Sequence, residues 1–215
     1  MKIKIEIKSV LGKVLFALEK ENNTIKDTIE EAVRNNANLI NADLRNANLE
    51  YANLENANLI NANLYNANLI NANLINANLE YANLRNANLE YANLENANLG
   101  NANLEYANLE NANLEYANLE NANLRNANLE NADLRNVNLE NVKNKETAIL
   151  PIFCKRNYGI KGDLIKIGCV EKTIEQWDLW FDSEEEYSTS RNTKDFKQIQ
   201  AVYNALKVYY LTLNK

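Results

Sequence analysis

The feature that most constrains the fold of this chain is a five-residue repeat. Leucine recurs at every fifth position from Leu39 to Leu139, which makes 21 consecutive units. Ala, and Val in the last unit, stands two residues before each Leu, and Asn or Asp stands between them. Asn or Tyr stands two residues after Leu, and only the position directly after Leu varies freely. The fold must therefore advance in steps of five residues.

A period of five excludes the ordinary secondary structures. Side chains five residues apart drift around an α-helix, and they alternate between the two faces of a flat strand. A disordered tract has no reason to place Leu and Ala so regularly. The pattern predicts a solenoid in which each unit makes one short side and one corner. Ala and Leu then point into the core, where we expect a stack of Leu39, Leu59, Leu79, Leu99, Leu119 and Leu139.

The repeat resembles the pentapeptide repeat family, whose pattern is A(N/D)LXX, over residues 37–141. This resemblance implies an all-β fold, a right-handed quadrilateral β-helix with twenty residues per coil. Twenty-one units would give about five coils and a rod about 25 Å long. At this spacing the Asn side chains can form amide ladders between coils.

The corners of such a coil require tight turns. Asn tolerates a positive φ at a turn, whereas a bulky residue does so poorly. We therefore expect a different corner geometry wherever Tyr replaces Asn, which happens at Tyr51, Tyr81, Tyr91, Tyr106 and Tyr116.

Residues 1–36 predict a small α+β cap for the first coil, because the end of a solenoid needs covering. Ile3, Ile5 and Ile7 alternate with charged residues, which indicates a strand. Residues 14–18 predict a second strand after a turn near Gly12, and Thr24 is placed to begin a short helix.

Residues 142–215 form a segment of different composition, with mixed hairpin and helical signals. YGIKGDLIKIGCV, at residues 158–170, predicts a hairpin, and Thr173 to Gln176 is a capping box before a helix. An amphipathic helix is expected over residues 196–213. The segment resembles the tail of other pentapeptide repeat proteins from bacteria and their phages, a resemblance that implies no activity. It is either a plug for the open end of the rod or a dimerisation or partner-binding module.

Charge and composition exclude several kinds of site. The chain has 23 basic and 29 acidic residues, a net charge of −6, which argues against binding nucleic acid or anionic membranes through bulk charge. It has no histidine and no glycine-rich phosphate loop, and its loosely spaced C-terminal carboxylates favour helix and turn electrostatics over catalysis. We expect no cofactor, no metal and no catalytic residue.

The expected compartment is the cytoplasm. Charged residues interrupt any signal-peptide core at the N-terminus, and no apolar run is long enough to span a membrane. Cys154 and Cys169 are then expected to be reduced and buried, with a disulfide between them as the alternative.

Two sets of residues are candidates for interaction. The variable position is apolar throughout the second coil, at Ile60, Tyr65, Ile70 and Ile75, and clustered apolar groups often mark contacts with a cap, a partner or a second copy. Trp177 and Trp180 lie at helical spacing with Phe181, which favours a core position, with an aromatic ligand site as the alternative.

The repeat is also acidic, with eleven Glu and two Asp against four Arg, a net charge of −9. Quinolone-resistance members of the resembled family mimic DNA and bind DNA gyrase. A stretch of B-form DNA as long as this rod carries about 15 charges, and the uninterrupted repeat lacks the loops that those members insert. The leading hypothesis is a non-enzymatic scaffold that binds a protein partner. An acidic DNA mimic and a C-terminal ligand-binding or enzymatic module are the alternatives.

Overall fold

The structure is a computed structural model that describes residues 1–144, 158–161, 164–167 and 170–182, together with residues 200, 203 and 207. The chain divides into two compact units, Met1–Leu150 and Pro151–Lys215. Within the described part, no helix has the length and apolar character needed to cross a bilayer. Cys154 and Cys169 lie outside the described residues, so their predicted state stays a prediction.

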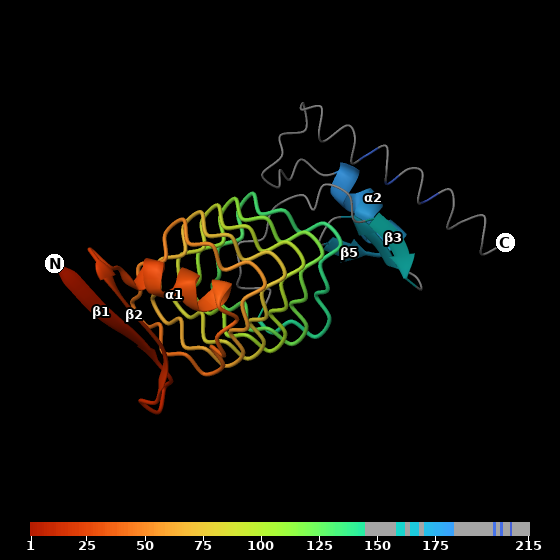
Figure 1. Ribbon diagram of the computed structural model, residues 1–215. Helices are drawn as coiled ribbons and strands as arrows, with labels where there is room; N and C mark the ends of the chain where they lie inside the picture. The colour runs from red at the N-terminus through yellow and green to blue at the C-terminus, as the bar shows by residue number, and fades with distance from the viewer. Residues whose placement is uncertain are drawn as a thin grey trace. The chain divides into compact units, whose positions relative to one another are not determined.

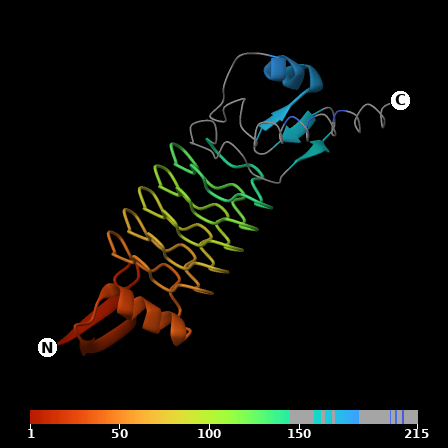
Figure 2. The same cartoon turned by 90° about the horizontal axis from the view of Figure 1, so that it is seen from above.

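The repeat folds into stacked coils of twenty residues (Figures 1 and 2). Parallel β-bridges join residues twenty apart, from Asp43–Asn63 to Asn123–Lys143. Each unit ends in a turn in which the N–H of Ala donates to the carbonyl of the Leu three residues earlier, as from Ala82 to Leu79 (2.9 Å). The residue before each Ala has a φ between 52° and 61°, a type II turn. Four such turns per coil give the coil four sides.

Every backbone N–H of a central unit has a hydrogen-bond partner, as residues 81–85 illustrate. The N–H of Leu84 donates to the carbonyl of Asn103 in the next coil (2.8 Å), and that of Asn83 to Ala62 in the previous coil (2.9 Å). The corner N–H also bonds to the next coil. The variable residue faces outward and donates to a side chain instead, from Arg85 N to Asn83 Oδ1 (3.2 Å). The Asn or Asp between Ala and Leu is therefore part of the backbone bonding scheme.

The same Asn side chains form the predicted ladder between coils. Asn118 Nδ2 donates to Asn98 Oδ1 (3.2 Å), and Asn138 Nδ2 donates to Asn118 Oδ1 (2.9 Å). Asp43 and Asp133 keep the bond to the outward N–H, because a carboxylate oxygen accepts it equally well. This explains why the position accepts only Asn and Asp.

The leucine stack is buried as predicted with one exception. Leu39, Leu59, Leu79, Leu99 and Leu119 are at most 1% exposed. Leu139 is only half-buried, so its prediction as an equal member of the core stack is wrong. Leu139 lies in the last unit of the repeat, after which the five-residue spacing of leucines stops in the sequence.

The prediction of a distinct geometry at the tyrosine corners is also wrong. The five corner tyrosines have φ values of 57–59°, within the range of the asparagine corners. Each tyrosine N–H donates to the next coil just as Asn does, for example from Tyr91 to Glu110 (3.0 Å). These bonds and the buried Ala and Leu on either side fix the turn, whatever side chain occupies it.

The predicted N-terminal elements are present as β1 (Lys2–Lys8), β2 (Val14–Glu21) and α1 (Ile25–Arg34). The two strands pair antiparallel around Gly12, and Thr24 caps α1 reciprocally with Asp27. All three lie at the first-coil end of the rod (Figure 1). The first coil has no preceding coil to bond to, and the N-terminal segment supplies partners.

These partners come from both the hairpin and the helix. The carbonyl of Lys8 accepts from Asp43 N (2.7 Å), and Asn41 O accepts from Val10 N (2.9 Å). The carboxylate of Glu30, on α1, accepts from Asn53 N (2.8 Å). The segment therefore completes hydrogen bonds that inner coils make with one another.

In the second unit, β3 (Tyr158–Lys161), β4 (Leu164–Ile167) and β5 (Val170–Lys172) form an antiparallel sheet, followed by α2 (Ile174–Asp182). The predicted hairpin is present and is extended by β5. The capping box is confirmed, since Thr173 Oγ1 accepts from Gln176 N (3.3 Å) and Gln176 Oε1 from Thr173 N (3.0 Å). Of the helix predicted over residues 196–213, residues 200, 203 and 207 are described and are helical, and the rest lies outside the described residues.

Candidate functional site

The variable residues occupy the four edges of the rod, because each one is the second residue of a corner turn. The flat sides between the edges carry the Asn ladders. The first edge consists of Ile40, Ile60, Glu80, Gly100, Glu120 and Glu140. The second, the arginine edge, consists of Arg45, Tyr65, Arg85, Glu105 and Arg125. The third, the glutamate edge, consists of Glu50, Ile70, Glu90, Glu110 and Glu130. The fourth edge consists of Glu55, Ile75, Glu95, Glu115 and Arg135.

The predicted apolar belt places one residue on each edge at the level of the second coil. Ile60, Ile70 and Ile75 are half-buried, and Tyr65 is exposed. Ile70 and Ile75 each lie between glutamates of the coils before and after, whereas Ile60 lies between Ile40 and Glu80. The belt is therefore less exposed than the sequence suggests, and a contact there stays a prediction.

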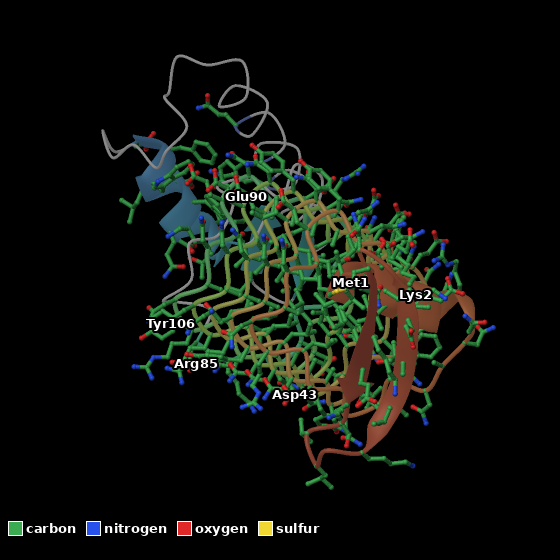
Figure 3. All side chains as sticks on the ribbon, turned by 60° about the vertical axis from the view of Figure 1, so that its left-hand side comes forward. Met1, Lys2, Asp43, Arg85, Glu90 and Tyr106 are labelled. Atoms are coloured by element: carbon green, nitrogen blue, oxygen red, sulfur yellow. The ribbon has the colours of Figure 1, made fainter. Side chains whose placement is uncertain are left out.

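The arginine edge carries a net charge of +2 on a rod that is otherwise acidic. Glu105 lies between two arginines, 3.5 Å from Arg85 Nε and 3.6 Å from Arg125 Nη1. The guanidinium of Arg85 also lies 5.9 Å from the ring centre of Tyr106, the next-coil corner residue, and Figure 3 shows the two together. Arg85, Arg125 and Tyr106 are exposed, and Glu105 is half-buried. Arg and Tyr are among the residue types enriched at protein interfaces.

The glutamate edge differs from the arginine edge in charge and in pairing. Its net charge is −4, and Glu90 points away from Arg85 in Figure 3. None of its glutamates forms an ion pair with another residue of the part that the structure describes, although Glu110 accepts hydrogen bonds from Asn111 and Asn128. Stacked carboxylates at the coil spacing repel one another, so this edge favours a cationic neighbour.

The corner tyrosines are strained and largely exposed. Tyr51, Tyr81, Tyr91, Tyr106 and Tyr116 combine a positive φ with exposed fractions of 45–62%. A left-handed backbone is costly for a residue of this kind and much less so for Asn. Little burial offsets that cost, so these positions are candidates for surface contacts.

Two ion pairs that sequence reasoning missed accompany the aspartates of the repeat. Arg45 Nε and Nη2 donate to both carboxylate oxygens of Asp43 (2.7 and 2.6 Å), which lowers the pKa of Asp43. Arg135 pairs with Asp133 and with Glu115 one coil earlier. The signal was in the sequence, because both Asp units read ADLR, with Arg two residues after Asp.

Trp177 and Trp180 of the second unit are core residues, as their helical spacing favours. They are 3% and 9% exposed and pack with Phe181, Tyr203 and Ile165. The Trp177 Nε1–H donates to the carbonyl of Ile165 (2.8 Å), and the two indoles meet edge to face at 5.5 Å. Their burial removes them from the candidate interaction surface.

Asp178, one of the loosely spaced C-terminal carboxylates, has a defined set of partners in the part of this unit that the structure describes. Lys207 Nζ lies 2.6 and 2.7 Å from its two oxygens, and the Tyr203 hydroxyl donates to it at 2.6 Å. The Lys207 hydrogen bond, followed by that of Tyr203, lowers the pKa of Asp178. Burial, then the Asp178 interaction, raises the pKa of Tyr203. This arrangement ties α2 to the helical residues 203 and 207.

Comparison with known proteins agrees with this geometry. The family model for pentapeptide repeats matches in eight copies, over residues 37–74, 67–105 and 102–141. The pentapeptide repeat protein Rfr23 from the cyanobacterium Cyanothece 51142 is 47% identical over 43% of this chain, with a TM-score of 0.43. The match spans 63% of the Rfr23 chain. A search of curated proteins finds no match.

Two further solved structures widen the comparison. The pentapeptide repeat protein alr5209 from Nostoc PCC 7120 is 38% identical over 45% of this chain and 72% of its own, with a TM-score of 0.30. QnrB1, a plasmid-mediated fluoroquinolone resistance protein, is 19% identical over 67% of this chain and 66% of its own, with a TM-score of 0.50. This last likeness is one of fold. The chain therefore belongs to the pentapeptide repeat family, and its four-sided coil is the right-handed quadrilateral β-helix of that family.

Proposed function

We propose that this chain is a non-enzymatic scaffold, a rod of about five coils whose edges bind another protein. The observation that carries the proposal is the retention of strained, exposed tyrosines at five corners. Asn fills the other corners of the repeat with the same backbone and less strain. A chain selected only for a stable rod would gain by having Asn there too, so the tyrosines support a role at the surface.

The arginine edge adds to this support. Arg85 and Tyr106 form a cation–π pair in which both side chains remain accessible, and Tyr and Arg supply a large share of binding energy at protein interfaces. The backbone bonds leave both side chains outside the folding scheme, so the edge can vary without loss of the fold.

The test compares the wild-type chain with a variant in which all five corner tyrosines become Asn, each used as bait for capture from a lysate of the native organism. The variant should fold at least as stably and should lose captured partners. A control bait carrying Glu80→Gln and Glu120→Gln, on the first edge, should keep them. Equal capture by all three baits would overturn the role of the tyrosines.

An acidic DNA mimic is the second candidate, because the glutamate edge carries four negative charges and no positive one. The neighbouring arginine edge, with a net charge of +2, departs from the uniformly negative surface of DNA. A mimic complex should weaken steeply as salt is raised, whereas a complex anchored by tyrosines should weaken little. The third candidate, a ligand-binding or enzymatic C-terminal module, receives less support, since the described side chains of that unit pack against one another.

A further inference from the structure

The arginine and glutamate edges border the same flat side of the rod. Each unit that leaves the arginine edge runs along this side and reaches the glutamate edge five residues later. The middle of the side is the Asn ladder of Asn48, Asn68, Asn88, Asn108 and Asn128. We call this side the shared face. One long border is thus cationic and the other anionic.

The order of residues along the two borders also matches, level by level. In successive coils the arginine edge reads Arg, Tyr, Arg, Glu, Arg, and the glutamate edge reads Glu, Ile, Glu, Glu, Glu. In three coils an arginine on one border lies at the same level as a glutamate on the other. In the second coil Tyr65 lies at the same level as Ile70. The remaining pair is Glu105 with Glu110, and there Arg85 and Arg125 already neutralise Glu105.

We propose that the shared face binds the shared face of a second copy of this chain, in a parallel two-fold dimer. A two-fold axis parallel to the rods places the arginine edge of one copy against the glutamate edge of the other. The same rotation repeats this contact on the opposite border, so the interface is closed and self-complementary. The rotation does not shift either rod along its axis. An arginine and the glutamate it meets, five residues later in the sequence, therefore differ in height only by a quarter of the coil spacing, about 1 Å.

The other three sides fit a second copy less well in the same arrangement. The side between the first and second edges would match Arg with Glu in two coils, and the side between the fourth and first edges in one. The side between the third and fourth edges would set Glu against Glu in three coils, Ile70 against Ile75 in one and Glu130 against Arg135 in one. Electrostatic complementarity, which fixes register and excludes wrong partners, thus selects the shared face.

The size of the face sets the strength of the contact. A side about 25 Å long and about 12 Å wide covers roughly 300 Å² per copy. Stable interfaces bury about 800 Å² per partner, so this dimer is weak and forms only at high protein concentration. At about 0.15 M salt the Debye length of about 8 Å screens the net charge of −6 on each chain, while direct Arg–Glu contacts persist.

This inference rests on the proposed role of the edges and names their partner. The test is sedimentation of the full chain over a concentration series, where the average mass should rise from 24.5 kDa towards twice that value. Exchanging Glu50, Glu90 and Glu130 for Arg should weaken self-association about tenfold or more. A control that exchanges Glu55, Glu95 and Glu120 for Arg alters charge equally outside the shared face and should leave it unchanged.

Rescue identifies the arrangement. A chain with Arg45, Arg85 and Arg125 all changed to Glu should not self-associate, but it should form a mixed dimer with the Glu-to-Arg variant. If that chain folds poorly, the corresponding Arg-to-Gln variant replaces it, with loss of self-association as the expected result. For the parallel register, Arg45→Glu should be rescued by Glu50→Arg and not by Glu130→Arg.

A wild-type chain that stays monomeric at the highest concentration, or a mixture that shows no rescue between folded variants, overturns the dimer. The scaffold proposal is judged separately, because its tyrosine variant leaves the arginines and glutamates of both borders intact.

Discussion

The Asn118 side chain offers a sharp test of how the rod is held together. Its Oδ1 accepts from Glu120 N (3.0 Å) and from Asn138 Nδ2 (2.9 Å), and its Nδ2 donates to Asn98 Oδ1 (3.2 Å). Asn118→Ala removes all three bonds. At about 0.5–1.5 kcal/mol net for each, we expect a loss of about 2–4 kcal/mol in the free energy of unfolding.

Asn118→Asp separates the acceptor from the donor. The carboxylate still accepts from Glu120 N and Asn138 Nδ2, so only the bond to Asn98 is lost. Its expected cost is about 0.5–1.5 kcal/mol. Both variants are measured by equilibrium urea unfolding, with fluorescence and circular dichroism compared to check that the transition remains cooperative. Equal losses for Ala and Asp would refute the acceptor role, and so would a loss below about 0.5 kcal/mol for Ala.

Three further predictions concern the corners, the core and the N-terminal helix. Tyr91→Asn should raise the free energy of unfolding by about 0.5–1 kcal/mol, because Asn adopts the left-handed turn with less strain, and a decrease in urea unfolding would contradict this. Leu99→Ala should lower it by about 3–5 kcal/mol and Leu139→Ala by clearly less, because only Leu99 is fully buried; equal losses on thermal melting would argue against a graded stack. The Lys20 ammonium, then Thr24, lowers the pKa of Asp27 from 3.8 to about 2, so the carboxylate stabilises the fold above its unfolded pKa and that contribution is lost as pH falls towards 2. The stability difference between wild type and Asp27→Asn should therefore shrink on acidification, and a constant difference would exclude the linkage.

Much of the fold was predictable because every unit of the repeat has the same buried positions and the same turn position. Ala and Leu at fixed offsets specify one buried column, and a period of five leaves few backbones that can build it. The strands on either side of Gly12, the helix after Thr24 and the capping box at Thr173 were predictable from local turn and cap chemistry. In these places local preference and final structure agree.

The failures arise where context outweighs residue type. A tyrosine alone disfavours a positive φ, but bonds from neighbouring coils hold Tyr91 in the same turn as Asn. Leu139 stands in the same Asn-Leu-Glu-Asn sequence as Leu119, yet it lies in the last unit of the repeat and stays half-buried. Sequence reasoning placed the variable residues on the four sides of each coil and not at its corners, because the corner placement requires knowing that the variable residue is part of the turn.

The assignment of backbone bonds has a consequence for how such a rod can change its surface. The outward N–H of every unit bonds to the Asn or Asp two residues earlier, so a replacement at a variable position alters one point on one edge and leaves the coil intact. Lengthening is different. Inserting twenty residues adds a coil and keeps every later residue on its edge, whereas inserting five turns all later residues by a quarter of the circumference. After such an insertion the row formed by Arg45, Arg85 and Arg125 would continue along a neighbouring edge. The charge pattern of the surface would be interrupted at the insertion, while Ala and Leu would still fill the core.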